Sequence, residues 1–169
     1  MLFTEIKKST NIIIEKKLST LLIRFLPLSF LMIWTTGFIQ PALLTQNNSL
    51  TDYFLTRIYS RVCHQESSKC IMIASENMLV CARCTGIYLG ALGTSLLFVI
   101  HSIPTLRIKV LLIASLPLLL DVCCTSMGVY KYSQIIAVIT GLAFGGIVYL
   151  FLISELENFF LNKSIKRNE

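Results

Sequence analysis

The chain has 169 residues, of which 54% are hydrophobic and only 14% are charged, and its formal net charge is +6. Soluble domains carry about 25% charged residues, and the apolar residues here are gathered in long runs, so the composition excludes an ordinary soluble domain. The basic residues flank those runs and form no face with base-reading or stacking groups, which excludes a nucleic-acid-binding protein.

The apolar runs predict an all-α membrane protein, a single domain with four transmembrane helices. The expected spans are residues 21–44, 84–101, 109–124 and 134–153, with an outer loop at 45–83. A crossing needs about 20 apolar residues, so the second and third runs are short. The first run is longer than the apolar core of a secretory signal and no cleavage site follows it, so we expect an uncleaved anchor. The predicted partner of all four spans is the lipid bilayer.

Lysine and arginine near the spans predict the orientation, because cytoplasmic segments are enriched in these residues. The bases in the outer loop are diluted by Asp52, Glu66 and Glu76. We therefore expect a protein of the inner (cytoplasmic) membrane with both termini in the cytoplasm. The bases expected on the cytoplasmic side are Lys7, Lys8, Lys16, Lys17, Arg107, Lys109, Lys163, Lys166 and Arg167, and those expected outside are Arg57, Arg61, Lys69 and Lys131.

The segment from Leu50 to Val62 has apolar residues at every fourth position. This spacing predicts a short amphipathic helix within the outer loop. A helix of this kind lies on the outer membrane surface, and the equally weighted alternative is a loop segment packed on the helix bundle.

Two glycine motifs of the form G-x3-G occur in the second and fourth spans, each preceded by threonine. They are Gly86/Gly90 and Gly141/Gly145, which are 55 residues apart. Small residues at this spacing let membrane helices approach closely. We expect these glycines to serve packing within the chain rather than dimerisation. The similarity of the two motifs suggests that the chain contains a duplicated helical hairpin.

A Cys/His cluster in the outer loop predicts a metal site. Its pattern is C-H-x5-C-x10-C-x2-C, formed by Cys63, His64, Cys70, Cys81 and Cys84. A C-x2-C pair lets two thiolates reach one tetrahedral ion, and a second pair completes a zinc site. We expect Cys63, Cys81 and Cys84 to bind zinc or another transition metal, with His64 and Cys70 competing for the fourth position. Residues 77–80 suit a short hairpin that leads into the second span.

Other functions compete with metal binding. Cys123 and Cys124 end the third span and are also expected outside. A thiol–disulfide oxidoreductase would exchange Cys81 and Cys84 with this second pair and use a quinone as cofactor, since a C-x2-C pair at the mouth of a four-helix membrane bundle resembles quinone-coupled disulfide-generating proteins. Static disulfides are a third interpretation, and a small transporter or a structural membrane protein is a weaker one. Metal binding ranks first because a disulfide relay has no need of His64 beside Cys63.

Asp121 is the only carboxylate within an apolar run. An ionisable group inside a span is costly and is often functional, so Asp121 is the candidate catalytic residue, as a proton acceptor or a group that orients the ligands. The alternative is a residue at the membrane interface. We expect Arg83, between Cys81 and Cys84, to anchor at the interface rather than to tune the thiols.

The strings CHQ at 63–65 and CARCTGIYLG at 81–90 resemble a family of small bacterial and archaeal membrane proteins known as domain of unknown function 2085. The resemblance covers residues 59–146 and includes Asp121 and the closing TG-x3-G at 140–145. It implies a multi-pass membrane protein and no particular activity. The family tends to carry glycine where Val122 stands and arginine near Ala137. If that arginine pairs with the aspartate in relatives, the resemblance implies that Asp121 lacks its partner here.

Overall fold

The computed structural model describes residues 2–43, 49–73, 76–101 and 104–166, and most of them are helical. Residues 44–48 and 74–75 of the predicted outer loop, and Arg167 of the predicted basic tail, lie outside the described residues. The elements are, in chain order, α1 (Leu2–Leu43), α2 (Ser49–Tyr59), the 3₁₀ turn η1 (Ser67–Lys69), β1 (Cys70–Ile73), β2 (Glu76–Cys81), α3 (Ala82–Phe98), α4 (Ile108–Ser126) and α5 (Gln134–Lys166).

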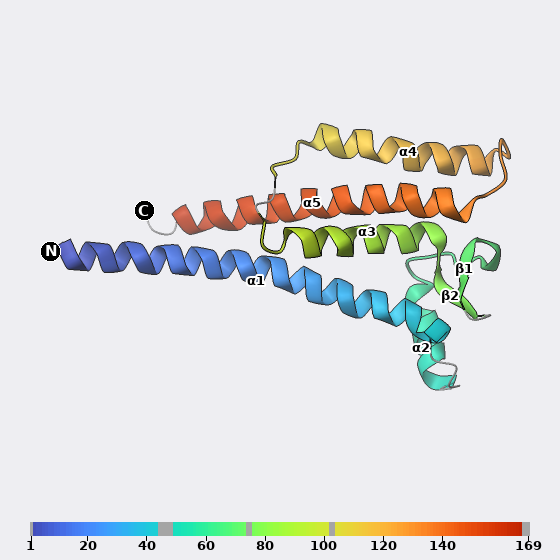
Figure 1. Cartoon of the computed structure of the whole chain (residues 1–169), viewed down its shortest axis with the longest axis horizontal. Helices are drawn as coiled ribbons and strands as arrows, with labels where there is room; N and C mark the ends of the chain where they lie inside the picture. Colours follow the sequence, from blue (N-terminus) through green and yellow to red (C-terminus); the bar gives the residue numbers. More distant parts are fainter. Residues whose placement is uncertain (1, 44–48, 74–75, 102–103, 167–169) are drawn as a thin grey trace.

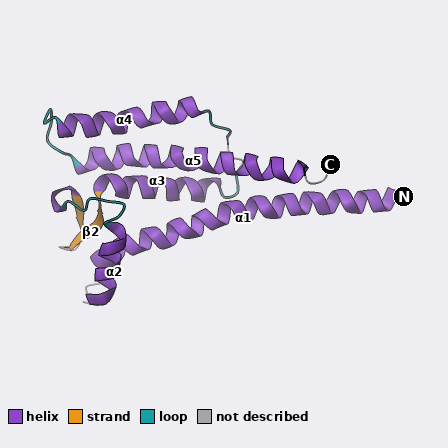
Figure 2. Ribbon diagram, turned by 180° about the vertical axis from the view of Figure 1, so that it is seen from behind, coloured by secondary structure: helices purple, strands orange, loops and turns teal. Residues whose placement is uncertain are grey.

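The four longest helices lie side by side along the long axis of the molecule (Figure 1). The antiparallel β1–β2 hairpin, α2 and the connection between α4 and α5 gather at one end, which we call the cysteine end (Figure 2). The start of α1 and the end of α5 lie toward the opposite end. The hairpin leads directly into α3, as predicted from residues 77–80.

In the described part of the chain, three helices are long and apolar enough to cross a membrane. The segments are Thr20–Gln40 of α1, Ile108–Ser126 of α4 and Gln134–Phe160 of α5. They contain most of the first predicted span and all of the third and fourth. The predicted span at 84–101 corresponds to α3, which has 17 residues and is therefore about 26 Å long at 1.5 Å per residue. That length is slightly below the thickness of a typical hydrocarbon core.

The helices α3 and α5 touch through their backbones, as the glycine motifs predict. A Cβ atom added at Gly86 or Gly90 would lie less than 3.0 Å from the carbonyl oxygen of Val138 or Leu142. Close approach of this kind lets dispersion and weak hydrogen bonds hold membrane helices together. The expectation that these glycines serve packing within the chain is confirmed.

The contact is reciprocal. A Cβ atom at Gly141 would lie 2.5 Å from the carbonyl oxygen of Arg83, and one at Gly145 would be equally obstructed by Ile87. Each glycine thus meets the residue three positions before a glycine of the other motif. Since α3 and α5 both begin at the cysteine end (Figure 1), they run in the same direction and meet in equivalent ways, as a duplicated hairpin would require.

An ion pair ties three helices together at the end opposite the cysteines. The Arg24 side chain of α1 donates from Nε to Glu157 of α5 at 2.5 Å. Its Nη1 donates to the carbonyl oxygens of Phe98, at the end of α3, and His101, at 3.1 and 2.7 Å. The guanidinium therefore satisfies backbone carbonyls that the last turn of a helix leaves free.

Candidate metal site

Cys63 is held by the turn that follows α2. Its amide donates to the carbonyl oxygen of Tyr59 at 2.9 Å. Two residues later, Gln65 adopts a left-handed backbone conformation with φ of 50°, and its side-chain amide donates to the carbonyl oxygen of Leu79 in β2 at 2.9 Å. The glutamine thus reverses the chain and fastens the Cys63 turn to the hairpin.

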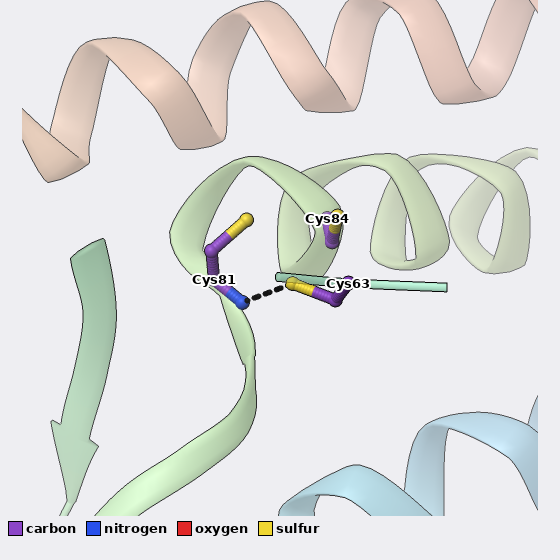
Figure 3. Close-up of side chains that lie close together, drawn as sticks. All are labelled: Cys63, Cys81 and Cys84. Carbon is purple, nitrogen blue, oxygen red and sulfur yellow. Dashed lines mark hydrogen bonds between the residues drawn. The ribbon is translucent and has the colours of Figure 1, made fainter. Parts of the chain in front are cut away.

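Cys81 and Cys84 lie where a strand becomes a helix. Cys81 is the last residue of β2 and the residue before the first turn of α3, so its backbone is still extended. Cys84 lies within that first turn. Because the two cysteines are three positions apart across the start of a helix, both thiols reach the same region (Figure 3).

Three sulfur atoms converge at the cysteine end. The Sγ atoms of Cys63, Cys81 and Cys84 all lie within 4.8 Å of one another. The backbone amide of Cys81 donates a hydrogen bond to Cys63 Sγ at 3.2 Å (Figure 3). Cys63 is buried and the other two are half-buried, against an apolar cluster that includes Phe38 and Val80. All six cysteines are among the described residues, and all are free thiols.

The surroundings of Cys81 and Cys70 shift the pKa values of their thiols in opposite directions. The pKa of Cys81 is lowered to about 5, chiefly because the Cys84 thiol donates a hydrogen bond to it, with help from the backbone amide of Cys84. Burial raises the pKa of Cys70 to about 11, and the nearby Cys63 and Cys81 add to that increase. The lowered pKa favours the thiolate form of Cys81, which is the form that binds metals and attacks disulfides.

The other predicted site residues lie outside this three-sulfur cluster. Among the described His, Cys, Asp and Glu side chains, only Cys63, Cys81 and Cys84 form such a group. His64 is exposed. Cys70 is 2% exposed and lies opposite Cys81 in the register of the hairpin. The remaining two, Cys123 and Cys124, are near the end of α4.

Asp121 is buried, and both oxygens of its carboxylate accept hydrogen bonds. Its Oδ2 accepts hydrogen bonds from Nε and Nη2 of Arg83 at 3.1 and 2.5 Å, and its Oδ1 accepts one from the Tyr130 hydroxyl. Asp121 therefore has a partner in Arg83, and the implication that it lacks one is wrong. The partner comes from α3, inside the C-x2-C motif, and not from α5.

The turn after α4 brings Tyr130 back to Asp121. Gly128 has a φ of 73°, and the amides of Gly128 and Val129 donate to the carbonyl oxygens of Thr125 and Cys124. This pair of bonds is the Schellman motif that ends many helices at a left-handed glycine. Neither Arg83 nor Tyr130 was predicted as a partner of Asp121. The usable signal was the pair of opposite charges, with Arg83 at the start of one apolar run and Asp121 near the end of the next.

Helices of this length and apolarity, arranged around an ion-paired and glycine-packed interior, define a multi-pass helical membrane protein. One family of membrane proteins matches the chain. The family described as a predicted membrane protein, domain of unknown function 2085, matches residues 63–151, slightly more than half of the chain. The chain belongs to this family.

A relative supports the assignment. The chain is 28% identical over 135 residues to a protein of Methanocaldococcus jannaschii described as uncharacterized, and the similarity covers 75% of this chain and 86% of the relative. No solved structure matches. The matched family region begins at Cys63, so it includes all three sulfurs of the cluster, Arg83 and Asp121.

Proposed function

We propose that Cys63, Cys81 and Cys84 bind one transition-metal ion, with Zn²⁺ the best match, at the cysteine end of this membrane protein. The observation that carries the proposal is the convergence of the three sulfurs within 4.8 Å, although Cys63 and Cys81 are 18 residues apart in the chain. Thiolates are preferred ligands of zinc and of other soft or borderline metal ions. A C-x2-C pair with a third cysteine from a neighbouring turn is a common arrangement of such ligands.

The spacing of the sulfurs fits a metal. Zn–S bonds of about 2.3 Å place the sulfurs of a tetrahedral site roughly 3.8 Å apart. The separations here do not exceed 4.8 Å, so the thiols need to close by about 1 Å at most. The hydrogen bond from the Cys81 amide to Cys63 Sγ is also of the kind that supports thiolate ligands from outside the coordination sphere.

Cys70 is the better of the two proposed fourth ligands. It faces Cys81 across the hairpin and is buried, as Cys63 is. His64 points to an exposed position beside Cys63. Asp121 contributes indirectly, since it holds Arg83 between the two cysteines of the C-x2-C motif.

Metal analysis with single-cysteine variants tests this function. Protein purified under mild reduction should contain about one metal ion per chain, and its cluster thiols should react with a thiol reagent only after chelation. Cys81→Ser and Cys63→Ser should lose the metal, because three thiolates are needed to hold it. Cys123→Ser, an exposed cysteine outside the cluster, is the matched control and should keep the metal. Metal-free protein with paired cysteines would contradict the proposal.

The second candidate is a membrane thiol–disulfide oxidoreductase, favoured by the Cys81 thiolate and the Cys84 thiol that donates to it. In that function a Cys81–Cys84 disulfide would accept two electrons and two protons from a dithiol substrate and pass them to a quinone. The same measurements separate the candidates, since the second one predicts no metal, two fewer free thiols and a co-purified quinone. Cys123 and Cys124 would supply the second pair.

The proposed topology has four crossings, with α3 as the second. Two observations support a crossing by α3: it runs beside α5 from the cysteine end toward the opposite end (Figure 1), and its glycines bring its backbone into contact with α5. Both termini are then cytoplasmic and the cysteines face outward.

Reporter fusions test the topology. A fluorescent protein that matures only in the cytoplasm should be bright when fused after residue 169, and a phosphatase that folds only outside should be active when inserted after Val129, in the connection between α4 and α5. The reverse pattern would invert the orientation. Reporters found on the same side of the membrane would contradict a crossing by α5, the helix between the two fusion points.

A further inference from the structure

The helix α2 presents a large apolar face to its surroundings. Leu50, Tyr53, Phe54 and Ile58 are between 49% and 76% exposed. At 100° per residue these four side chains fall on one side of the helix, whereas Tyr59, on the opposite side, is buried. The helix therefore packs on the protein with one face and leaves an apolar face without a protein partner among the described residues.

Two exposed arginines lie at the apolar face. The helical period places Arg57 between the positions of Tyr53 and Ile58, and Arg61 follows in the turn directly after α2. Long cationic side chains in the middle of an apolar face suit a membrane surface, because the stems lie on acyl chains while the guanidinium groups reach lipid phosphates. An ordinary protein interface tends to exclude charge from its centre.

The depth of α2 is fixed by α1. The Tyr59 hydroxyl donates to the carbonyl oxygen of Trp34 at 2.7 Å, and it passes directly over Gly37, where an added Cβ would clash with it. Trp34 lies six residues before Gln40, the end of the candidate span, which is about 9 Å along a helix. The last turn of α2 is therefore held near the level at which α1 leaves the hydrocarbon.

We propose that α2 is an interfacial helix that lies in the leaflet at the cysteine end, with its apolar face in the boundary between headgroups and acyl chains and with Arg57 and Arg61 on lipid phosphates. Since the amide of Cys63 is bonded to the carbonyl oxygen of Tyr59, the same contact holds the three-sulfur cluster at headgroup depth. The proposal does not depend on whether the cysteines bind a metal.

Tryptophan fluorescence in vesicles tests the proposal, because Trp34 is the only tryptophan of the chain. In a Trp34→Phe background, which keeps an aromatic ring and the backbone acceptor for Tyr59, a tryptophan is introduced as Phe54→Trp on the apolar face. Thr56→Trp, also exposed but outside that face, is the matched control. The full-length protein is reconstituted in phosphatidylcholine and phosphatidylglycerol vesicles with and without brominated acyl chains.

Brominated lipid should quench the Phe54→Trp emission severalfold more than the Thr56→Trp emission, whereas acrylamide should quench the control more. Equal acrylamide quenching of both variants, without quenching by brominated lipid, would overturn the proposal. Protection of Phe54→Trp from both quenchers would also overturn it, since a protein would then cover the face. Tyr53→Trp, 66% exposed on the same face, repeats the measurement if the first variant folds poorly.

Discussion

Alanine at Gly90 or Gly145 should destabilise the folded protein by about 3 kcal/mol or more, whereas alanine at Gly93 should leave its stability unchanged. A Cβ at either of the first two positions would lie less than 3.0 Å from backbone atoms of the facing helix. Backbone cannot move aside as a flexible side chain can, so α3 and α5 must separate, and overpacking of this kind typically costs about 1–3 kcal/mol at a single side-chain contact.

Gly93 is the matched control because it lies on the same helix, three residues after Gly90, with nothing within 4 Å of an added Cβ. The free energy of unfolding can be measured by titrating the protein from mild detergent into sodium dodecyl sulfate. Similar stabilities of Gly90→Ala and Gly93→Ala would show that the contact between α3 and α5 does not support the fold.

The same helix contact also positions the candidate site. The carbonyl oxygen that faces Gly141 belongs to Arg83, which lies between the two cysteines of the C-x2-C motif. Any displacement of α3 from α5 at this level therefore moves Cys81 and Cys84 relative to Cys63. The TG-x3-G and CARCTG strings, which look unrelated in the sequence, are in contact across one helix interface.

Much of this architecture could be predicted from the sequence because it depends on local patterns. Apolar runs identified α1, α4 and α5 as candidate spans, and the G-x3-G spacing identified the surface that α3 and α5 share. The cysteine spacing identified the three residues that converge. Each of these signals reflects a physical period or a ligand spacing that is visible within one segment of the chain.

The parts that could not be predicted depend on contacts between distant segments. The sequence pattern treated His64 and Cys70 alike, but the strand register and the turn at Gln65 expose the first and bury the second. Arg83 was not predicted to pair with Asp121 because the two residues are 38 positions apart. Tyr130 reaches that partner only through the left-handed turn at Gly128. Tertiary geometry, and not local propensity, decides all three outcomes.

Neutralising Asp121 should be as damaging as the glycine substitutions. The carboxylate is 5% exposed and its partner Arg83 has a side chain only 20% exposed. Removal of one member of a buried ion pair leaves an unpaired charge, which typically costs about 3–5 kcal/mol. We therefore expect Asp121→Asn and Arg83→Gln each to lower the free energy of unfolding by an amount in that range. Because Arg83 lies between Cys81 and Cys84, either variant should also weaken binding of the proposed metal ion.

The double variant distinguishes pairing from a general need for either residue. With both charges removed, Arg83→Gln/Asp121→Asn should recover much of the stability that each single variant loses, since no unpaired charge remains near the membrane interior. The exposed pair Glu66–Lys69 offers the control, because Glu66→Gln removes an ion pair that water already solvates and should change nothing measurable. Additive losses in the double variant would mean that the two residues act separately, and the link from α4 to the C-x2-C motif would then have to run through the backbone contacts of α5.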